Sequence, residues 1–130
     1  MTSRLAVPFA CALIMSLPVR AQEPQIADGP QAAPINLIRD LAEILGRAHA
    51  VRTLCNGDQD VTWRNYMVNM MSYEAPSGPR RAAVTEAFNR GYRSQTRETP
   101  ACSNASARIE AGIAARGKDL ADEIARAYMQ

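Results

Sequence analysis

The sequence predicts an all-α protein, an up-down-up-down four-helix bundle that is closed by one disulfide and follows a cleaved signal peptide and a flexible leader. Three observations support this fold class. From residue 34 onward, apolar residues recur at spacings of three and four, the period of an amphipathic helix. Stretches rich in Pro, Gly and Asn divide that part of the chain into four segments. Cys55 and Cys102 stand at segment ends, where a bridge would hold the first segment against the last.

The first 21 residues have the three parts of a secretory signal peptide. Arg4 supplies a positive start, residues 5–17 are an apolar run, and Val19 and Ala21 occupy the positions that signal peptidase reads. The run of 13 residues is shorter than the roughly 20 that span a bilayer. We therefore expect cleavage after Ala21 and a periplasmic product with no stable membrane span. A retained anchor and lipidation of Cys11, which lies inside the run, are the alternatives.

Cleavage also changes the charge of the chain. It removes Arg4 and Arg20, so the 15 basic residues of the full chain become 13, equal to its 13 acidic residues. A neutral chain lacks the positive surface that nucleic-acid binding requires, and its longest basic run is Arg80-Arg81. The 109 residues after cleavage suffice for one domain with a single core. That domain is expected over residues 34–130, after a flexible leader at 22–33.

The cysteines predict a structural disulfide. Cys11 leaves with the signal peptide, and two cysteines in an exported chain most simply pair, here Cys55 with Cys102. Their spacing is not CxxC, which excludes a thioredoxin-like pair and a c-type haem site. A zinc site would need further ligands, and His49 is the only histidine, so we expect no metal and no cofactor. In the chain-entropy model, closing a loop of about 48 residues contributes roughly 4 kcal/mol.

The first helix is expected over residues 34–54, because Asn56-Gly57 suits the left-handed backbone of a helix end. The second helix begins at Asp60 or Thr62 as N-cap. It ends before the Pro- and Gly-rich stretch at residues 75–79, which is the strongest break in the chain.

The third helix begins at Ser77 or Gly78 and reaches Arg93 or Arg97, and the fourth is expected over residues 104–128. A bridge from the end of the first helix to the start of the fourth makes these two antiparallel neighbours. The short connections between the other helices make their directions alternate as well.

Two glycines inside these helices predict close helix packing. Gly91 lies next to Tyr92, and Gly117 lies on the apolar side between Ile113 and Leu120. A glycine at such a position leaves room for the backbone or side chains of a neighbouring helix.

Glu74 is the polar residue whose position most needs an explanation. It follows Met67 and Met70 at seven and four residues, so it shares their apolar face, where a carboxylate needs a partner. We expect an ion pair with Arg81 or with Arg93. An acid/base role is the alternative.

Three stretches, LCNGDQDVTWRNYM (54–67), YEAP (73–76) and AFNRGYR (87–93), together with the Cys102 segment, resemble a family of small exported alphaproteobacterial proteins known only as conserved hypothetical. The chain departs from that pattern at Ser94-Gln95 and at the Ser-Asn start of the last helix. The resemblance implies no activity. The residues that it carries over are Cys55, Trp63, Arg64, Glu74, Ala75, Pro76, Phe88, Asn89, Gly91, Tyr92, Arg93 and Cys102.

We expect a periplasmic helical module that binds a partner protein or a cell-envelope component and is not an enzyme. This hypothesis requires an exposed apolar or aromatic patch. The alternatives are an envelope hydrolase or its accessory subunit using Glu74, which requires a cleft with a second carboxylate or a positioned water, and a periplasmic stress chaperone. No catalytic residue is assigned, His49 is expected at the edge of an apolar stripe, and the oligomeric state is open. The candidate binding residues are Arg64, Glu74, Asn89 and Arg93.

Overall fold

The computed structural model describes residues 32–130, and all the regular structure in that range is helical. Helix α1 spans Ile35–Asn56, α2 Thr62–Glu74, α3 Gly78–Glu98 and α4 Ser106–Ala127. Each helix begins within two residues of its predicted start. The predicted signal peptide, its cleavage site, Cys11 and residues 22–31 of the leader lie outside the described residues.

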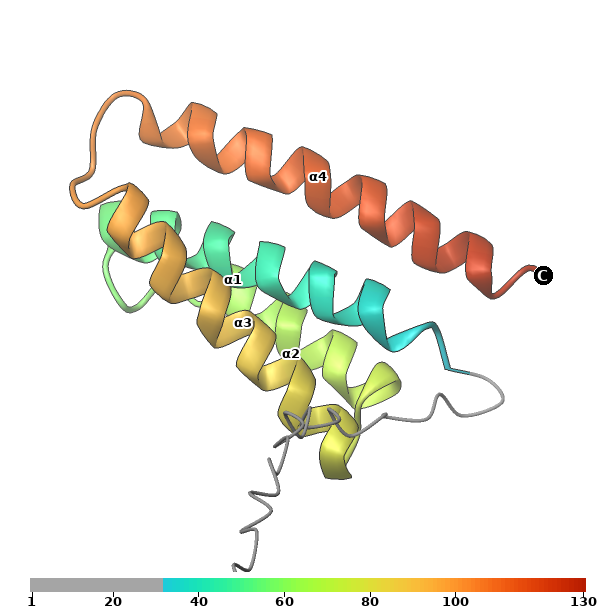
Figure 1. Ribbon diagram of the computed structural model, residues 1–130. Coiled ribbons are helices and arrows are strands. Elements are labelled where there is room, and N and C mark those ends of the chain that lie inside the picture. The colour runs from blue at the N-terminus through green and yellow to red at the C-terminus, as the bar shows by residue number, and fades with distance from the viewer. Residues whose placement is uncertain (1–31) are drawn as a thin grey trace, which may run out of the picture.

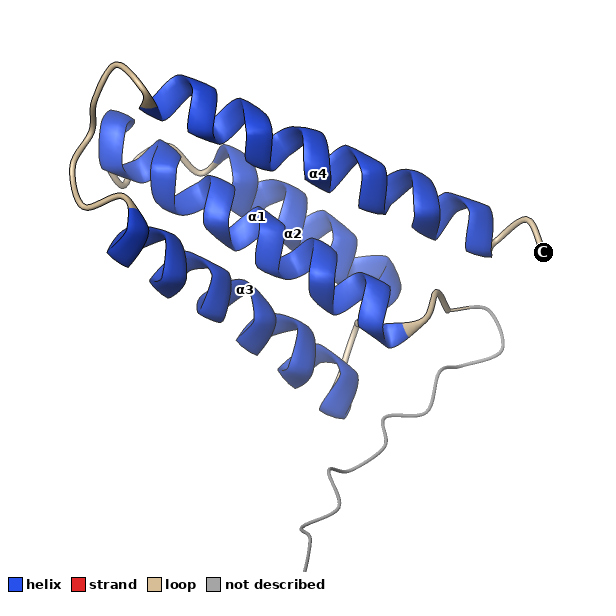
Figure 2. Cartoon of the chain, turned by 45° about the horizontal axis from the view of Figure 1, so that its top comes forward, coloured by secondary structure: helices blue, strands red, loops and turns tan. Residues whose placement is uncertain are grey.

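Helix α1 is the centre of the arrangement. It packs against each of the other three helices, α2 and α3 also touch each other, and the backbone of α4 approaches α1 alone. Figure 1 shows α4 along one side of α1 and α3 along another, and Figure 2 shows α2 behind α1. Residues of α1 are therefore buried on several sides, in agreement with its long run of small and aliphatic side chains.

The predicted disulfide between Cys55 and Cys102 is present, with the two Cα atoms 5.1 Å apart. It joins the end of α1 to the segment that precedes α4. From this end, α4 runs back along α1 in the opposite direction (Figure 1). At its far end, the hydroxyl of Tyr128 accepts a hydrogen bond of 3.2 Å from the backbone N–H of Ala33, just before α1.

The core consists of two clusters that share α1. The larger lies among α1, α2 and α3, where Ile38 and Val84 are fully buried beside Met67 and Met71, and it also includes Ile124 of α4. The smaller lies between α1 and α4, and its buried members are Ile44, Ala48, Val51 and Ile113. Helix α4 therefore contributes to both clusters, through Ile124 and Ile113.

Two glycines form the crossing of α1 and α3. A Cβ atom added at Gly46 would overlap the backbone carbonyl of Phe88, and one added at Gly91 would overlap the carbonyl of Glu43. The two backbones are therefore in direct contact, which confirms the close approach predicted at Gly91 and adds Gly46, which no sequence pattern singled out. At Gly117 a Cβ would lie 3.2 Å from Ile44 Cγ2, so the predicted tight packing is found there too.

Candidate functional site

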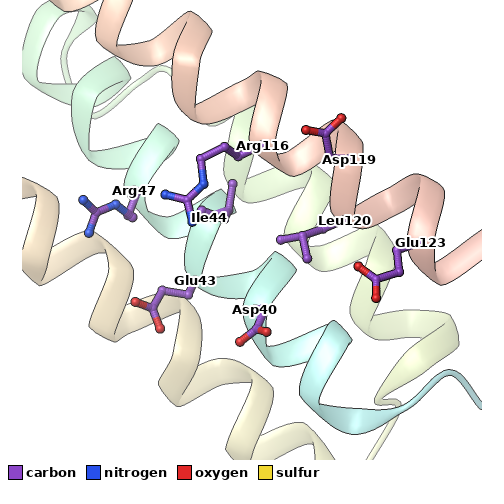
Figure 3. A pocket seen from close by; sticks show the side chains of 8 residues that line it. All are labelled: Asp40, Glu43, Ile44, Arg47, Arg116, Asp119, Leu120 and Glu123. Atoms are coloured by element: carbon purple, nitrogen blue, oxygen red, sulfur yellow. The ribbon is translucent and has the colours of Figure 1, made fainter.

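Helix α4 packs along α1, with a groove on each of its two sides. On the flank towards α3 lies a charged cavity of about 540 Å³ (Figure 3). Two of its charged side chains are bonded to α3, since Glu43 accepts from Arg90 at 2.8 Å and Arg47 donates to Glu98 at 2.6 Å. Its lining residues are Asp40, Glu43, Ile44, Arg47, Arg116, Asp119, Leu120 and Glu123.

The other flank of α4 forms an apolar groove with α2. It has a volume of about 510 Å³, and Lys118 is its one charged lining residue. The groove exists because the backbones of α2 and α4 both approach α1 but not each other. It is lined by Leu41, Ile44, Leu45 and Ala48 of α1, Trp63, Tyr66 and Met70 of α2, and Ala114, Gly117, Lys118 and Ala121 of α4.

A hydrogen bond between α2 and the α4 segment lies at each end of this groove. At one end, the indole N–H of Trp63 donates to Glu110 Oε1 at 2.7 Å. At the other end, the hydroxyl of Tyr128 donates to Glu74 Oε1 at 2.5 Å. The two bonds join α2 to the α4 segment on either side of the groove, whose lining runs from Trp63 to Met70 on α2 and from Ala114 to Ala121 on α4.

The outer face of α2 is exposed and uncharged. Tyr66 is 59% exposed, Val68 51% and Tyr73 86%. Between Arg64 and Glu74, which stand near the two ends of the helix, α2 has no charged residue. This face adjoins the apolar groove because Tyr66 belongs to both. We call it the α2 face, comprising the exposed residues Asn65, Tyr66, Val68, Asn69, Ser72 and Tyr73.

Glu74 has a different partner from the one predicted. The expected ion pair with Arg81 or Arg93 is wrong, because within residues 32–130 Glu74 bonds to Tyr128 instead. Arg93 pairs with Glu86 at 2.7 Å. The second carboxylate oxygen, Oε2, is buried without a hydrogen-bond partner in the described part of the chain.

Arg80, rather than Arg81, organises the junction beside Glu74. Its guanidinium donates at 2.5 Å both to the backbone carbonyl of Glu74 and to that of Ala33. Arg81 makes longer bonds of 3.4 Å to the carbonyls of the Ala75-Pro76 turn. Arg80 and Tyr128 thus tie the ends of α2 and α4 to the segment that enters α1, which is a structural role for this cluster.

The four candidate binding residues do not converge. Arg64 is exposed near the start of α2, whereas Glu74 is its last residue. Asn89 and Arg93 are exposed on α3. No hydrogen bond or ion pair within the described residues joins any two of these four side chains.

A second network lies at the disulfide end, and sequence reasoning found only one member of it. Arg52 donates to Asp60 at 2.8 Å and to Glu110 at 3.0 Å. Asp60 also accepts from Asn56 and from the N–H of Thr62, but the N-cap residue of α2 is Val61, so the predicted cap at Asp60 or Thr62 is wrong by one residue. These bonds hold the pKa of Asp60 far below its usual value, and the bonds from Asn56 and Thr62 have the largest effect. The network spans 58 residues of sequence between Arg52 and Glu110, so no local pattern predicts it.

His49 is half-buried between two aromatic rings, those of Phe88 at 5.8 Å and Tyr92 at 5.6 Å between centroids. Its Nδ1 is buried and has no hydrogen-bond partner among residues 32–130. Burial, and then the charge of Arg64, lower the pKa of His49 below 6.5. The side chain is therefore a neutral packing group at neutral pH, as its place at the edge of the apolar stripe predicted.

We expect His49 to make the stability of the domain depend on pH. The unfolded chain takes up a proton near pH 6.5, whereas the folded chain takes it up only at lower pH. The free energy of unfolding should therefore fall as the pH drops below 6.5, and His49→Gln should remove this part of the dependence. Urea unfolding of both proteins from pH 7.5 to about 5 measures it. Parallel curves would contradict the prediction. The lowered pKa of Asp60 also makes the free energy of unfolding depend on pH. That loss of stability occurs only below the ordinary aspartate pKa of 3.8, outside this window.

Neither a metal-binding group of side chains nor a membrane-spanning helix is found among the described residues. No three His, Cys, Asp or Glu side chains within 32–130 are grouped so that they could hold a metal ion. None of the four helices is long and apolar enough to cross a membrane.

The chain belongs to a protein family described as Protein of unknown function (DUF2385), whose model matches residues 36–128. The match covers all four helices, the disulfide, the apolar groove and the α2 face. It agrees with the resemblance to a conserved hypothetical family. No curated protein and no solved structure matches the chain.

Proposed function

We propose that this chain is a periplasmic helical module that acts by binding, its partner being a protein or another component of the cell envelope. The signal peptide is removed after Ala21, and the exported domain is an up-down-up-down bundle closed by its disulfide. The contact surface is the α2 face together with the apolar groove. The observation that supports this proposal is the exposed, uncharged, aromatic character of that face.

The composition of the α2 face is typical of the centre of a protein interface. Interface cores are depleted in charged residues and enriched in Tyr, Trp and Met, which are the residues along the groove side of α2. The exposed parts of the other helices are charged: Glu86 and Arg93 on α3, for example, and Lys118 and Asp122 on α4. An apolar patch rimmed by polar residues marks an interaction site more often than a random feature of a surface.

The placement of Glu74 favours binding over hydrolysis. A carboxylic acid catalyst needs access to substrate and a second carboxylate or a positioned water. Glu74 is instead bonded to Tyr128 beside the Arg80 junction, and it is not among the residues that line the charged cavity or the apolar groove. We therefore assign it to the structure of the domain.

Site-specific photo-crosslinking in the exporting cell tests the proposal. A photoreactive residue at Tyr73, in the α2 face, should give a discrete adduct, whereas the same residue at the exposed Arg97 of α3 should not. Tyr73→Glu should then weaken binding of the purified partner at least tenfold, as expected for an aromatic residue at the centre of an interface. Equal, diffuse labelling at both positions would contradict a defined contact surface and favour a chaperone-like activity.

A further inference from the structure

We infer that the partner of the α2 face is a carbohydrate, the neutral β-1,4-linked sugar strand of the cell wall, stacked on the rings of Tyr66 and Tyr73. This inference rests on the proposed function and names the envelope component that the face contacts. It follows from the spacing of the two exposed rings and from the unbonded amide groups that stand beside them.

Tyr66 and Tyr73 form a row along the outside of α2. They are seven residues apart, so their side chains leave the helix on the same side, within about 20°, and about 10 Å apart along its axis. Tyr66 is 59% exposed, and its ring centroid lies 5.6 Å from that of Trp63, which supports it on the side of the apolar groove. Tyr73 is 86% exposed. The helix therefore presents two separate aromatic rings in register.

The spacing of the rings matches a ligand that repeats at the same distance. In an extended β-1,4-linked glycan each sugar is turned over relative to the one before it, so every second sugar shows the same face to one side. The faces of sugar rings carry C–H groups, which pack against the faces of aromatic rings. One disaccharide unit has nearly the length that separates the two tyrosines. A strand lying along α2 can therefore stack one sugar on Tyr66 and the next sugar of the same orientation on Tyr73.

Polar side chains without protein partners stand beside the rings. Asn69 lies between Tyr66 and Tyr73 on the same side of the helix, and Asn65 and Ser72 precede the two tyrosines by one residue each. Within residues 32–130 the side-chain amides of Asn65 and Asn69 make no hydrogen bond. The hydroxyl of Ser72 donates to the carbonyl of Asn69 at 2.7 Å and can still accept. The combination of a ring and a polar group thus repeats every seven residues, as a disaccharide repeats along its strand.

A protein helix fits this row less well than a sugar strand does. A helix packed along Tyr66 and Tyr73 would bury the amide of Asn69 between the two rings, where it needs a hydrogen-bond partner. The hydroxyl and acetamido groups of a sugar strand supply such partners, directly or through water. Helix α2 has 13 residues, fewer than two heptads, whereas coiled-coil pairing is sustained over three or more.

The charge of the α2 face matches a neutral polymer. The face carries no charged residue, so it offers no partner to the phosphate groups of an anionic polymer, which basic side chains bind. We therefore expect binding of the sugar strand to change little with salt concentration.

A glycan that spans both rings should bind more tightly than a shorter one. Once one sugar is stacked on Tyr66, a linked sugar reaches Tyr73 at a high effective concentration. A disaccharide covers only one ring at a time. The affinity should therefore rise with the length of the oligomer, and the loss of either ring should remove this gain.

Nuclear magnetic resonance titration of the purified, oxidised chain with β-1,4-linked N-acetylglucosamine oligomers tests the inference. The hexasaccharide should shift the backbone signals of residues 65–73 and bind roughly tenfold or more tightly than the disaccharide. Tyr73→Ala should reduce the affinity for the hexasaccharide to that for the disaccharide, whereas Tyr73→Trp, which keeps a ring at this position, should retain it. Purified cell-wall glycan should sediment the unsubstituted chain but not Tyr73→Ala.

Two matched variants separate a ring in register from general aromatic or apolar character. Ser72→Tyr combined with Tyr73→Ala moves the ring about 100° around the helix, so it should not restore binding. Val68→Ala removes another apolar side chain of the α2 face, one that is 51% exposed, and should leave glycan binding unchanged. Far-ultraviolet circular dichroism confirms that every variant keeps its helices.

Three results would overturn the inference: no binding of the hexasaccharide or of cell-wall glycan, equal affinities for the two oligomers, or unchanged binding in Tyr73→Ala. Photo-crosslinking at Tyr73 then separates this failure from that of the proposed function. An adduct with a protein, in the absence of glycan binding, keeps the proposed function and removes the inference. The absence of both an adduct and glycan binding removes both.

Discussion

Replacing Gly46 or Gly91 by alanine should lower the free energy of unfolding by about 2 kcal/mol each. The added methyl group would overlap the backbone of the opposite helix, Phe88 in one case and Glu43 in the other. A backbone cannot move aside as a side-chain end can, so α1 and α3 must separate, and overpacking of this kind typically costs about 1–3 kcal/mol or more. The helix propensity of alanine offsets about 1 kcal/mol of that cost. Urea denaturation of the purified domain measures the change.

Gly112 provides the matched control. It also lies inside a helix, but a Cβ built there has no atom within 4 Å. Gly112→Ala should therefore raise the free energy of unfolding, by up to about 1 kcal/mol. Because Gly46 and Gly91 belong to one crossing, the double variant should lose less than the sum of the two single losses. If all three variants gained stability, the close crossing of α1 and α3 would be refuted.

Removal of the disulfide should have a similar or larger effect. In the chain-entropy model, a bridge across 47 residues contributes about 4 kcal/mol, so the double variant Cys55→Ala/Cys102→Ala should unfold at much lower urea concentration than the oxidised protein. The reduced wild-type chain is the control, and should match the double variant. If oxidised and reduced proteins unfolded at the same concentration, the bridge would not stabilise the fold.

The stability lost on removing the disulfide should also differ between the helices of the domain. The backbone of α4 approaches that of α1 alone, so the bridge, the Glu110 bonds and the Tyr128 bonds add to the side-chain packing that attaches this helix. Native-state hydrogen exchange of the double variant should therefore show faster exchange in α4 than in α1 and α3. Equal acceleration in all four helices would mean that α4 unfolds only with the whole domain.

Local patterns in the sequence were sufficient to predict the helices, their breaks and the disulfide. The spacing of apolar residues and the Asn-Gly and Pro-rich breaks act over a few residues, so they can be recognised without knowing the fold. The cysteine pair follows from the count of two cysteines that remain when Cys11, in the predicted signal peptide, is set aside. Gly91 and Gly117 were recognised because a glycine in a helix needs a packing reason.

The tertiary structure alone decided which faces meet. The apolar stripe on α1 is visible in the sequence, but not that it would contact all three other helices, nor that Gly46 would lie at a crossing. The sequence predicts that Glu74 pairs with Arg81 or Arg93, on the next helix, whereas its partner Tyr128 is 54 residues away. The apolar groove likewise depends on the backbones of α2 and α4 both approaching α1 but not each other. The spacing of apolar residues shows which face of a helix is buried, but not which other helix covers that face. The choice of neighbour depends on how side chains far apart in the sequence pack together.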